Sequence, residues 1–408
     1  MLSGLDFGTN SSEKIHIDKK GWSDERKRLF ETKLGALLKN PNFLLLHVPE
    51  EKGTKMKIIQ PSSDPYHRHR IIEGVNEGET TPRTWYALSH LWGITKADPH
   101  VWDNITQLVE DEYGQPVQPV SMRPEKRNTL LKLLEAYPNS YWWIDVLCAR
   151  HDTPLDIMGD IYACCTECIA LLDIDPEVIP EFHSVVDDAT SLTMGDPQLC
   201  NIFGSLIDCK WWKRVWTWQE MALPRTILLM AENATQVSEK HMMNLDCLPG
   251  YLPIVFHGLY AVLTDFFYQQ GLTHPLSFYV DLPNAFAIHG EVLFTRGTNS
   301  WRISADGLYA LFLSFKQSSR QCMEPVDYVY GILGILRLDI PRMNDHHQVW
   351  KLFLSKLDTL MIDLNCTKWK ISNDAHQVDL LAVENMADVY KDLLTLSDSE
   401  KLRMLQGM

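Results

Sequence analysis

Residues 141–148 have the sequence YWWIDVLC, an apolar and aromatic stretch that is typical of a buried β-strand and that carries one carboxylate, Asp145. We predict a strand over residues 142–147. Three other short stretches have the same character and are predicted strands: residues 85–90 (WYALSH), 168–174 (CIALLDI) and 226–230 (TILLM).

Helical patterns separate these strands. One covers residues 124–138 and ends at Pro138, one follows Pro154, and one extends from about residue 199 to Pro224. The alternation of strand and helix predicts an α/β fold with a doubly wound, mainly parallel sheet. A ligand of such a sheet binds beyond the carboxyl ends of its strands.

Two regions flank this pattern. Residues 1–83 are expected to form an N-terminal extension of helix and loop, with a charged helix over residues 22–38 and a loop over residues 61–70. Residues 84–235 hold the α/β pattern. Residues 236–408 are expected to be a mostly helical C-terminal region, which includes the apolar run at 250–272.

The composition and charge of the chain limit the partners and the compartments that we expect for it. The 408 residues are 45% hydrophobic and carry a formal net charge of -15, which argues against a nucleic-acid partner because such a partner needs a basic face. The N-terminus lacks the pattern of a secretory signal, and the apolar runs are shorter than the ~20 residues of a membrane span. We expect a soluble, cytoplasmic protein without a membrane span.

Nine cysteines in a chain without a secretory signal are expected to be reduced thiols. Cys164, Cys165 and Cys168 include a CxxC spacing, but no second CxxC or pair of histidines lies nearby to complete a zinc site. Buried thiols are therefore the preferred interpretation, and no metal is expected.

Three segments resemble, in order, the signature blocks of the HET domain of fungal heterokaryon-incompatibility proteins: YALSHLWG (86–93), WWIDVLC (142–148) and WWKRVWTWQE (211–220). EPVDYVYGILG (324–334) resembles a segment found downstream of that domain. The resemblance assigns residues 84–235 to a HET domain. Because HET domains are TIR-like, it implies a flavodoxin-like sheet, and many TIR domains cleave or rearrange NAD.

Within WTWQE, Glu220 resembles the key glutamate of TIR domains, which a tryptophan precedes by a few residues, here Trp216. A carboxylate can stabilise the positive charge that develops on the ribose when an N-glycosidic bond breaks. We expect Glu220 to be catalytic and Arg214 and Trp216 to contact the substrate. The alternative is that Glu220 only pairs with Lys213 or Arg214 on a partly solvated helix, with the tryptophans as core.

The other candidates for substrate binding are Ser89, His90, Trp92 and Gly93, at the end of the first predicted strand, and Asp145, a carboxylate inside the second. Alternatively, Ser89 and His90 cap the junction of strand and loop, and Trp92 packs in the core. Asp145 could instead be a structural acceptor for backbone N–H groups of the loop after the first strand.

The sequence departs from the family after Cys148, where Arg150 and His151 stand in place of Asp and Gln. The corresponding loop of TIR domains gates the site and contributes to assembly, so the departure bears on loop contacts and on catalytic competence.

The resemblance implies an NAD-cleaving effector of fungal self/non-self recognition and programmed cell death, with NAD as substrate and no cofactor. Self-association or a protein trigger is expected to switch it on. The alternative is a catalytically silent HET signalling module that acts by self-association. A dinucleotide-dependent oxidoreductase is disfavoured because no GxGxxG follows a predicted strand.

Overall fold

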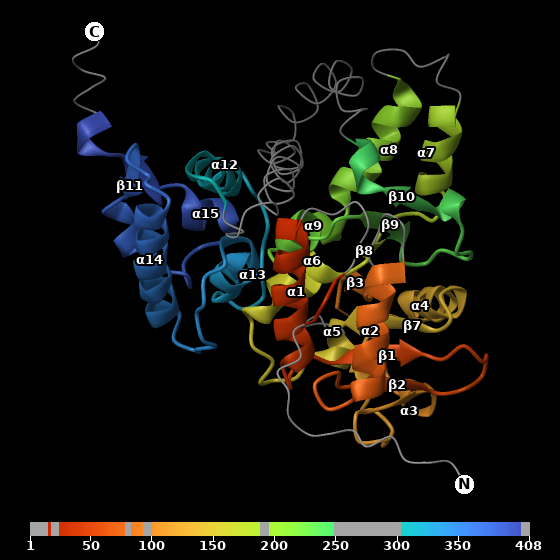
Figure 1. Cartoon of the computed structure of the whole chain (residues 1–408). Helices are drawn as coiled ribbons and strands as arrows, with labels where there is room; N and C mark the ends of the chain where they lie inside the picture. Colours follow the sequence, from red (N-terminus) through yellow and green to blue (C-terminus); the bar gives the residue numbers. More distant parts are fainter. Residues whose placement is uncertain are drawn as a thin grey trace.

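The computed structural model describes residues 15–17, 24–77, 83–92, 100–187, 196–248 and 303–400 (Figure 1). A central sheet holds the four predicted strands as parallel neighbours: β3 (Tyr86–His90), β7 (Ser140–Ile144), β8 (Glu167–Leu172) and β9 (Ile227–Ala231). Their side chains are almost entirely buried. The prediction of one mainly parallel sheet is confirmed.

The order of the parallel strands is β7-β3-β8-β9. Of these four strands, β3 comes first in the sequence, and it lies between β7 and β8, which come second and third. This is the flavodoxin-like order, and it confirms the predicted fold class. Connections leave β3 and β8 in opposite directions, so the sheet has its topological switch point between these two strands. Ligands of doubly wound sheets bind at this point, beyond the carboxyl ends of the strands.

Four further strands extend the sheet on both sides, giving the order β10-β9-β8-β3-β7-β1-β2-β5. β1 (Leu45–Val48) is antiparallel to β7 and to β2 (Met56–Ile59), and β2 is parallel to β5 (Val109–Glu110). β10 (Met242–Asn244) is antiparallel to β9. The N-terminal segment, expected to be helix and loop, thus also contributes two strands.

The expected N-terminal helix is α1 (Asp24–Lys39), but the expectation of a loop over residues 61–70 is wrong, because α2 (Pro65–Glu77) begins there. Proline is compatible with the first turn of a helix, and the Asp64 carboxylate accepts a hydrogen bond from the His67 backbone N–H. Ile71 and Val75 then bury one face of the helix.

The helices between the parallel strands follow the expected order. They are α4 (Pro124–Ala136) after β3, the short α5 (Asp145–Cys148) and α6 (Ile157–Cys164) after β7, and α7 (Val178–Asp187), α8 (Pro197–Asp208) and α9 (Thr217–Ala222) after β8. α3 (Ile105–Leu108) and the pair β4 (Val101–Trp102) and β6 (Val120–Ser121) lie in the loop between β3 and α4.

The single helix expected from about residue 199 to 224 is in fact broken. α8 is followed by the 3-10 turn η1 (Lys210–Lys213), and α9 begins only at Thr217. At the first break, the Asp173 carboxylate accepts hydrogen bonds from the Cys209 thiol and the Lys210 backbone N–H. These bonds attach the turn between α8 and η1 to the residue that follows β8.

The described part of the C-terminal region is mainly helical, as expected. Its helices are α12 (Ala305–Phe315), α13 (Asp327–Leu336), α14 (His346–Asp363) and α15 (Met386–Tyr390), and β11 (Trp369–Ile371) pairs with β12 (Leu394–Leu396). The apolar run at 250–272 lies outside the described residues. None of the described helices combines the length and the apolar character that crossing a membrane requires.

The three regions pack together around α6, which contacts α1, α9 and α13 (Figure 1). Asp160 of α6 accepts a hydrogen bond from Lys33 Nζ of α1 at 2.7 Å and one from Arg337 Nη2, at the end of α13, at 2.8 Å. One carboxylate of the α/β region thereby anchors both the N-terminal and the C-terminal segment.

Candidate functional site

Glu220 is buried at the carboxyl edge of the sheet, with only 6% of its surface exposed. α9 carries it across to the end of β3, where the Ser89 hydroxyl donates a hydrogen bond to Glu220 Oε2. Trp211 Nε1 donates in turn to Ser89 Oγ at 2.6 Å. Glu220 is therefore not a surface carboxylate paired on a partly solvated helix, but the acceptor at the end of a buried chain of hydrogen bonds.

The environment of Glu220 changes its ionisation. Burial raises the pKa of its carboxyl group to about 7, although the charge of Arg214 and hydrogen bonds from Ser89 and Tyr162 act to lower it. A carboxyl group with this pKa is divided between its protonated and ionised forms near neutral pH. It can therefore either donate or accept a proton there, as acid–base catalysis requires.

A second hydrogen-bonded group centres on Asp145. His90 Nε2 lies 2.9 Å from Asp145 Oδ1, and Trp92 Nε1 donates to Asp145 Oδ2 at 2.6 Å. Burial acts to raise the pKa of Asp145, but the His90 ring and the hydrogen bonds from His90 and Trp92 outweigh it and hold the pKa below its ordinary value. The structure thus joins three of the predicted site residues through one ionised carboxylate.

Asp145 does not lie inside a strand. The predicted strand over residues 142–147 ends at Ile144, and Asp145 is the first residue of α5. Its Oδ1 atom also accepts a hydrogen bond from the backbone N–H of Val146 at 2.7 Å, which favours the turn into α5. This change places the carboxylate at the end of β7 rather than within the sheet.

The charge of Arg214 acts on both carboxylates. Its Nη1 atom donates to the backbone carbonyl of His90 at 2.8 Å, at the end of β3. Its charge acts to lower the pKa values of both Glu220 and Asp145. The predicted residues Ser89, His90, Trp92, Asp145, Arg214 and Glu220 therefore lie at one edge of the sheet, whereas Gly93 lies outside the described residues.

Trp216 immediately precedes α9, and its side chain is hydrogen-bonded to Asp327 of α13. The tryptophan that is linked to Glu220, through Ser89, is Trp211. A contact between Trp216 and substrate stays a prediction.

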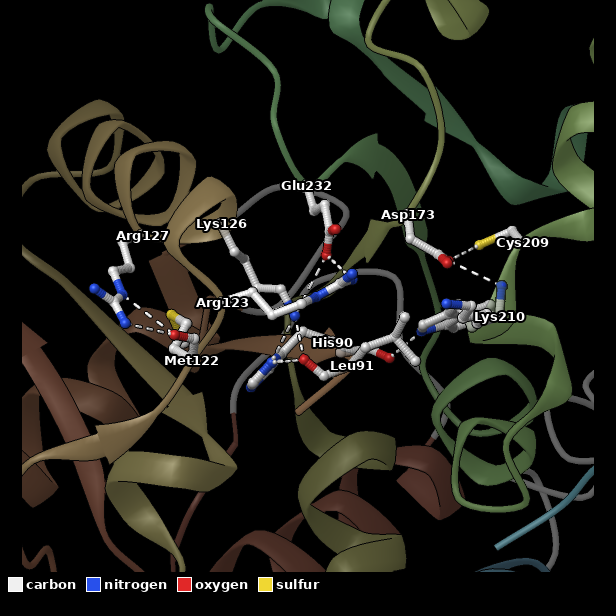
Figure 2. Close-up of polar contacts among 12 residues, drawn as sticks. His90, Leu91, Met122, Arg123, Lys126, Arg127, Asp173, Cys209, Lys210 and Glu232 are labelled. Atoms are coloured by element: carbon white, nitrogen blue, oxygen red, sulfur yellow. Dashed lines mark hydrogen bonds and ion pairs between the residues drawn. The ribbon is translucent and has the colours of Figure 1, made fainter. Parts of the chain in front are cut away.

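Sequence reasoning missed a third group at the same edge, formed by Arg123, Lys126 and Glu232 (Figure 2). Lys126 Nζ donates to the Leu91 carbonyl and lies 3.4 Å from His90 Nδ1 and 3.5 Å from Glu232 Oε2. Arg123 Nη2 lies 2.5 Å from Glu232 Oε2. Burial lowers the pKa of Lys126 to about 8, although Glu232 acts to raise it.

A signal for Lys126 was present in the sequence. Lys126 lies four residues before Leu130 and eight before Leu134, on the buried stripe of α4. A lysine on an apolar stripe must find a partner or a function, because burying an unpaired charge is costly. The partner, Glu232, follows β9 and could not be identified from local spacing.

The departure from the family after Cys148 has a structural explanation for Arg150. Its guanidinium pairs with Glu112, with Nη2 2.7 Å from Oε2, and donates to the Leu147 carbonyl. His151 is almost fully exposed. Neither residue is among those that surround Glu220 and Asp145.

All nine cysteines are free thiols, and Cys164, Cys165 and Cys168 are buried as expected. The described residues include one group with ligand atoms close enough for a metal ion, His346, His347 and Asp379, whose atoms lie within 4.8 Å of one another. This group belongs to the C-terminal region and is separate from the edge that carries Glu220.

Residues 85–220 match the family model described as heterokaryon incompatibility protein (HET). The match begins at the residue before β3 and ends at Glu220, so it spans about a third of the chain and both hydrogen-bonded carboxylates. No curated protein and no solved structure matches the chain. The chain carries a HET domain, which associates it with heterokaryon incompatibility.

Proposed function

We propose, from the premise that residues 85–220 form a HET domain, that this protein cleaves the nicotinamide glycosidic bond of NAD and that Glu220 is its essential carboxylate. The observation that carries the proposal is the position of Glu220. It lies at the switch point of a flavodoxin-like sheet and accepts a hydrogen bond from Ser89 at the end of β3. Burial raises the pKa of its carboxyl group to about 7.

A carboxylate at the position of Glu220 can assist the cleavage of the glycosidic bond in two ways. When the bond between ribose and nicotinamide breaks, its electron pair goes to the ring nitrogen, nicotinamide leaves as a neutral molecule, and positive charge develops on the ribose. Ionised Glu220 stabilises that charge. Water then adds to the ribose carbon and loses a proton, giving ADP-ribose. A raised pKa makes Glu220 a suitable acceptor for that proton.

Positive side chains at the same edge fit the two phosphates of NAD. Arg123 and Lys126 (Figure 2) lie near the ends of β3 and β9, and Arg214 is bonded to the end of β3, in a chain whose formal net charge is -15. Glu232 and the ionised Asp145 balance two of these charges. The support for NAD is therefore the presence of three cationic donors near Glu220, which can bind phosphate oxygens, and not a net positive charge.

The biological role that we propose is that of an effector of fungal self/non-self recognition and programmed cell death. Glu220 is only 6% exposed and is bonded to Ser89, so a substrate ribose must displace this contact. Self-association or a protein trigger would supply the necessary rearrangement. NAD is the substrate in this proposal, and no cofactor or metal takes part.

The second candidate function is a catalytically silent HET module that acts by self-association. The burial of Glu220 and its hydrogen bond from Ser89 also favour this candidate, because both are typical of a residue with a structural role. Incubation of the full chain with NAD, over a range of protein concentrations and with a crowding agent, decides between them. Release of free nicotinamide that rises more steeply than protein concentration supports the assembled enzyme. No release at any concentration supports the silent module.

A further inference from the structure

Arg320, in the C-terminal region, is buried against the segment that carries Glu220. Only 1% of its surface is exposed. Its Nη1 atom donates to the Arg214 carbonyl at 2.8 Å and to Thr217 Oγ1 at 2.5 Å, and its guanidinium lies 5.9 Å from the centre of the Trp218 ring. Arg320 therefore contacts the chain on both sides of the point where α9 begins.

The neighbouring residue strengthens this attachment through the backbone. Gln321 forms an isolated parallel bridge with Arg214. The Gln321 N–H donates to the Lys213 carbonyl at 2.6 Å, and the Val215 N–H donates to the Gln321 carbonyl at 3.1 Å. The turn between η1 and α9 is thus held by hydrogen bonds from outside the HET domain.

Helix α13 packs closely against the same turn and helix. A Cβ atom added to Gly331 would lie 2.6 Å from Val215 Cγ1, and one added to Gly334 would lie 2.5 Å from Gln219 Oε1. The Val215 and Gln219 side chains thus occupy the space that a side chain at position 331 or 334 would need, so glycine at these positions lets α13 pack against them. Together with the bond between Asp327 and Trp216, this contact fixes α9 from the side of the C-terminal region.

Hydrogen bonds to the backbone and to the side chain of Trp211 connect Arg320 indirectly with the candidate catalytic residue. Thr217 Oγ1, which Arg320 contacts, lies 2.7 Å from the Trp211 carbonyl. The Trp211 indole donates to Ser89, and Ser89 donates to Glu220. Glu220 itself follows Thr217 by three residues on α9, nearly one helical turn.

We infer that Arg320 is a positioning residue, which holds the turn at residues 214–217 and thereby holds Glu220 against Ser89. The inference rests on the proposed function for its catalytic consequence, but its structural part stands on the contacts alone. It means that the HET domain of this protein is completed by the C-terminal region, beyond the residues that match the family. It also gives that region a route by which a bound partner could control the site.

The test compares two arginines that both join the C-terminal region to the α/β region. Arg320→Gln removes the charged donor to the turn, whereas Arg337→Gln removes a bond of similar length to Asp160 of α6, away from the turn. Arg320→Lys keeps the positive charge but lacks the planar guanidinium group with its several donors. It replaces the glutamine variant in the experiment if that variant does not fold. All are made in the full chain, and their global unfolding is measured in parallel.

Hydrogen exchange decides the structural part. Loss of a hydrogen bond from a charged donor is expected to speed exchange of the backbone amides at 213–222 about tenfold to hundredfold in Arg320→Gln, with a smaller change in Arg320→Lys and none in Arg337→Gln. Equal changes in the two glutamine variants, or no change in this segment, would overturn the inference.

Turnover decides the catalytic part. Arg320→Gln is expected to lower kcat for nicotinamide release at least tenfold with KM within about twofold, while Arg337→Gln keeps both. Full kcat in Arg320→Gln overturns the positioning role. If the wild-type protein releases no nicotinamide, the proposed function fails, and the exchange result still decides whether Arg320 fixes the turn.

Discussion

The hydroxyl of Ser89 donates a hydrogen bond to the carboxylate of Glu220, although 131 residues separate the two in the sequence. The contact joins the end of the central strand β3 to α9, and it brings the first and third signature blocks of the HET domain together. It also explains how a charged side chain persists in the core, because a buried carboxylate needs donors around it.

Replacement of Glu220 by Gln is expected to lower nicotinamide release about a hundredfold to a thousandfold, because it removes the charge that stabilises the developing cation. The volume is almost unchanged, so the melting temperature at neutral pH should not fall. Product release and thermal unfolding are measured on the same preparation. Full turnover in the variant would show that Glu220 is not catalytic, and activity lost only in proportion to unfolding would assign it to the fold.

Glu220 also predicts how stability depends on pH. Its pKa in the folded state is about 7, above the ordinary 4.5, so its contribution to stability is fully present below pH 4.5 and is lost as the pH rises through 7. This shift corresponds to about 3 kcal/mol in the free energy of unfolding. Denaturant unfolding of wild type and Glu220→Gln at pH 5 and pH 8 measures it. The variant should gain stability relative to wild type at the higher pH, and an equal difference at both pH values would contradict the buried, raised pKa.

Asp145 is expected to have the opposite pH dependence. Its folded-state pKa is lowered, so its contribution is present above its ordinary pKa of 3.8 and is lost as the pH falls through the folded value. Asp145→Asn weakens the contacts with His90 and Trp92 and is expected to cost about 1.5 to 3 kcal/mol at pH 7 and progressively less as the pH falls below 3.8. Asp152→Asn, in an exposed ion pair with His151, is the control and should change stability little. A pH-independent loss in Asp145→Asn would argue against an ionised Asp145.

Two helical glycines have different surroundings, one in the contact of α6 with α13 and one in α8, and their replacement by alanine is predicted to have opposite effects on stability. A Cβ atom on Gly159 would lie 2.6 Å from Gly334 Cα, so Gly159→Ala must push the helices apart and is expected to cost about 1 to 3 kcal/mol. Gly204, within α8, has no described atom within 4 Å of an added Cβ, and Gly204→Ala is expected to stabilise by up to about 1 kcal/mol. Urea unfolding of both variants tests the pair. Equal stability of Gly159→Ala and wild type would refute the close contact.

The sequence by itself determined the four parallel strands and the helical character of the C-terminal region, and the resemblance to HET domains implied the flavodoxin-like class. The strands and helices follow from local patterns, because a short aromatic and β-branched run or a periodic apolar stripe indicates which backbone conformation buries it. The same reasoning singled out Asp145 as a carboxylate in an apolar run but placed it inside a strand, whereas it begins α5. Glu220 was singled out by the resemblance to TIR domains. Reasoning from local patterns also failed at residues 61–70, where a polar composition concealed a helix whose first turn accepts Pro65.

Only the tertiary structure decided which distant groups meet. The pairing of β1 with β7, the contact of Lys126 with Glu232, and the attachment of Arg320 to Thr217 each join segments far apart in the chain. Local spacing carries no information on such pairs, since each depends on how strands are ordered and how helices cross the sheet. The pKa of Glu220 belongs to the same class, because it follows from burial, from hydrogen bonds with Ser89 and Tyr162, and from the charge of Arg214, and these residues lie on three separate segments.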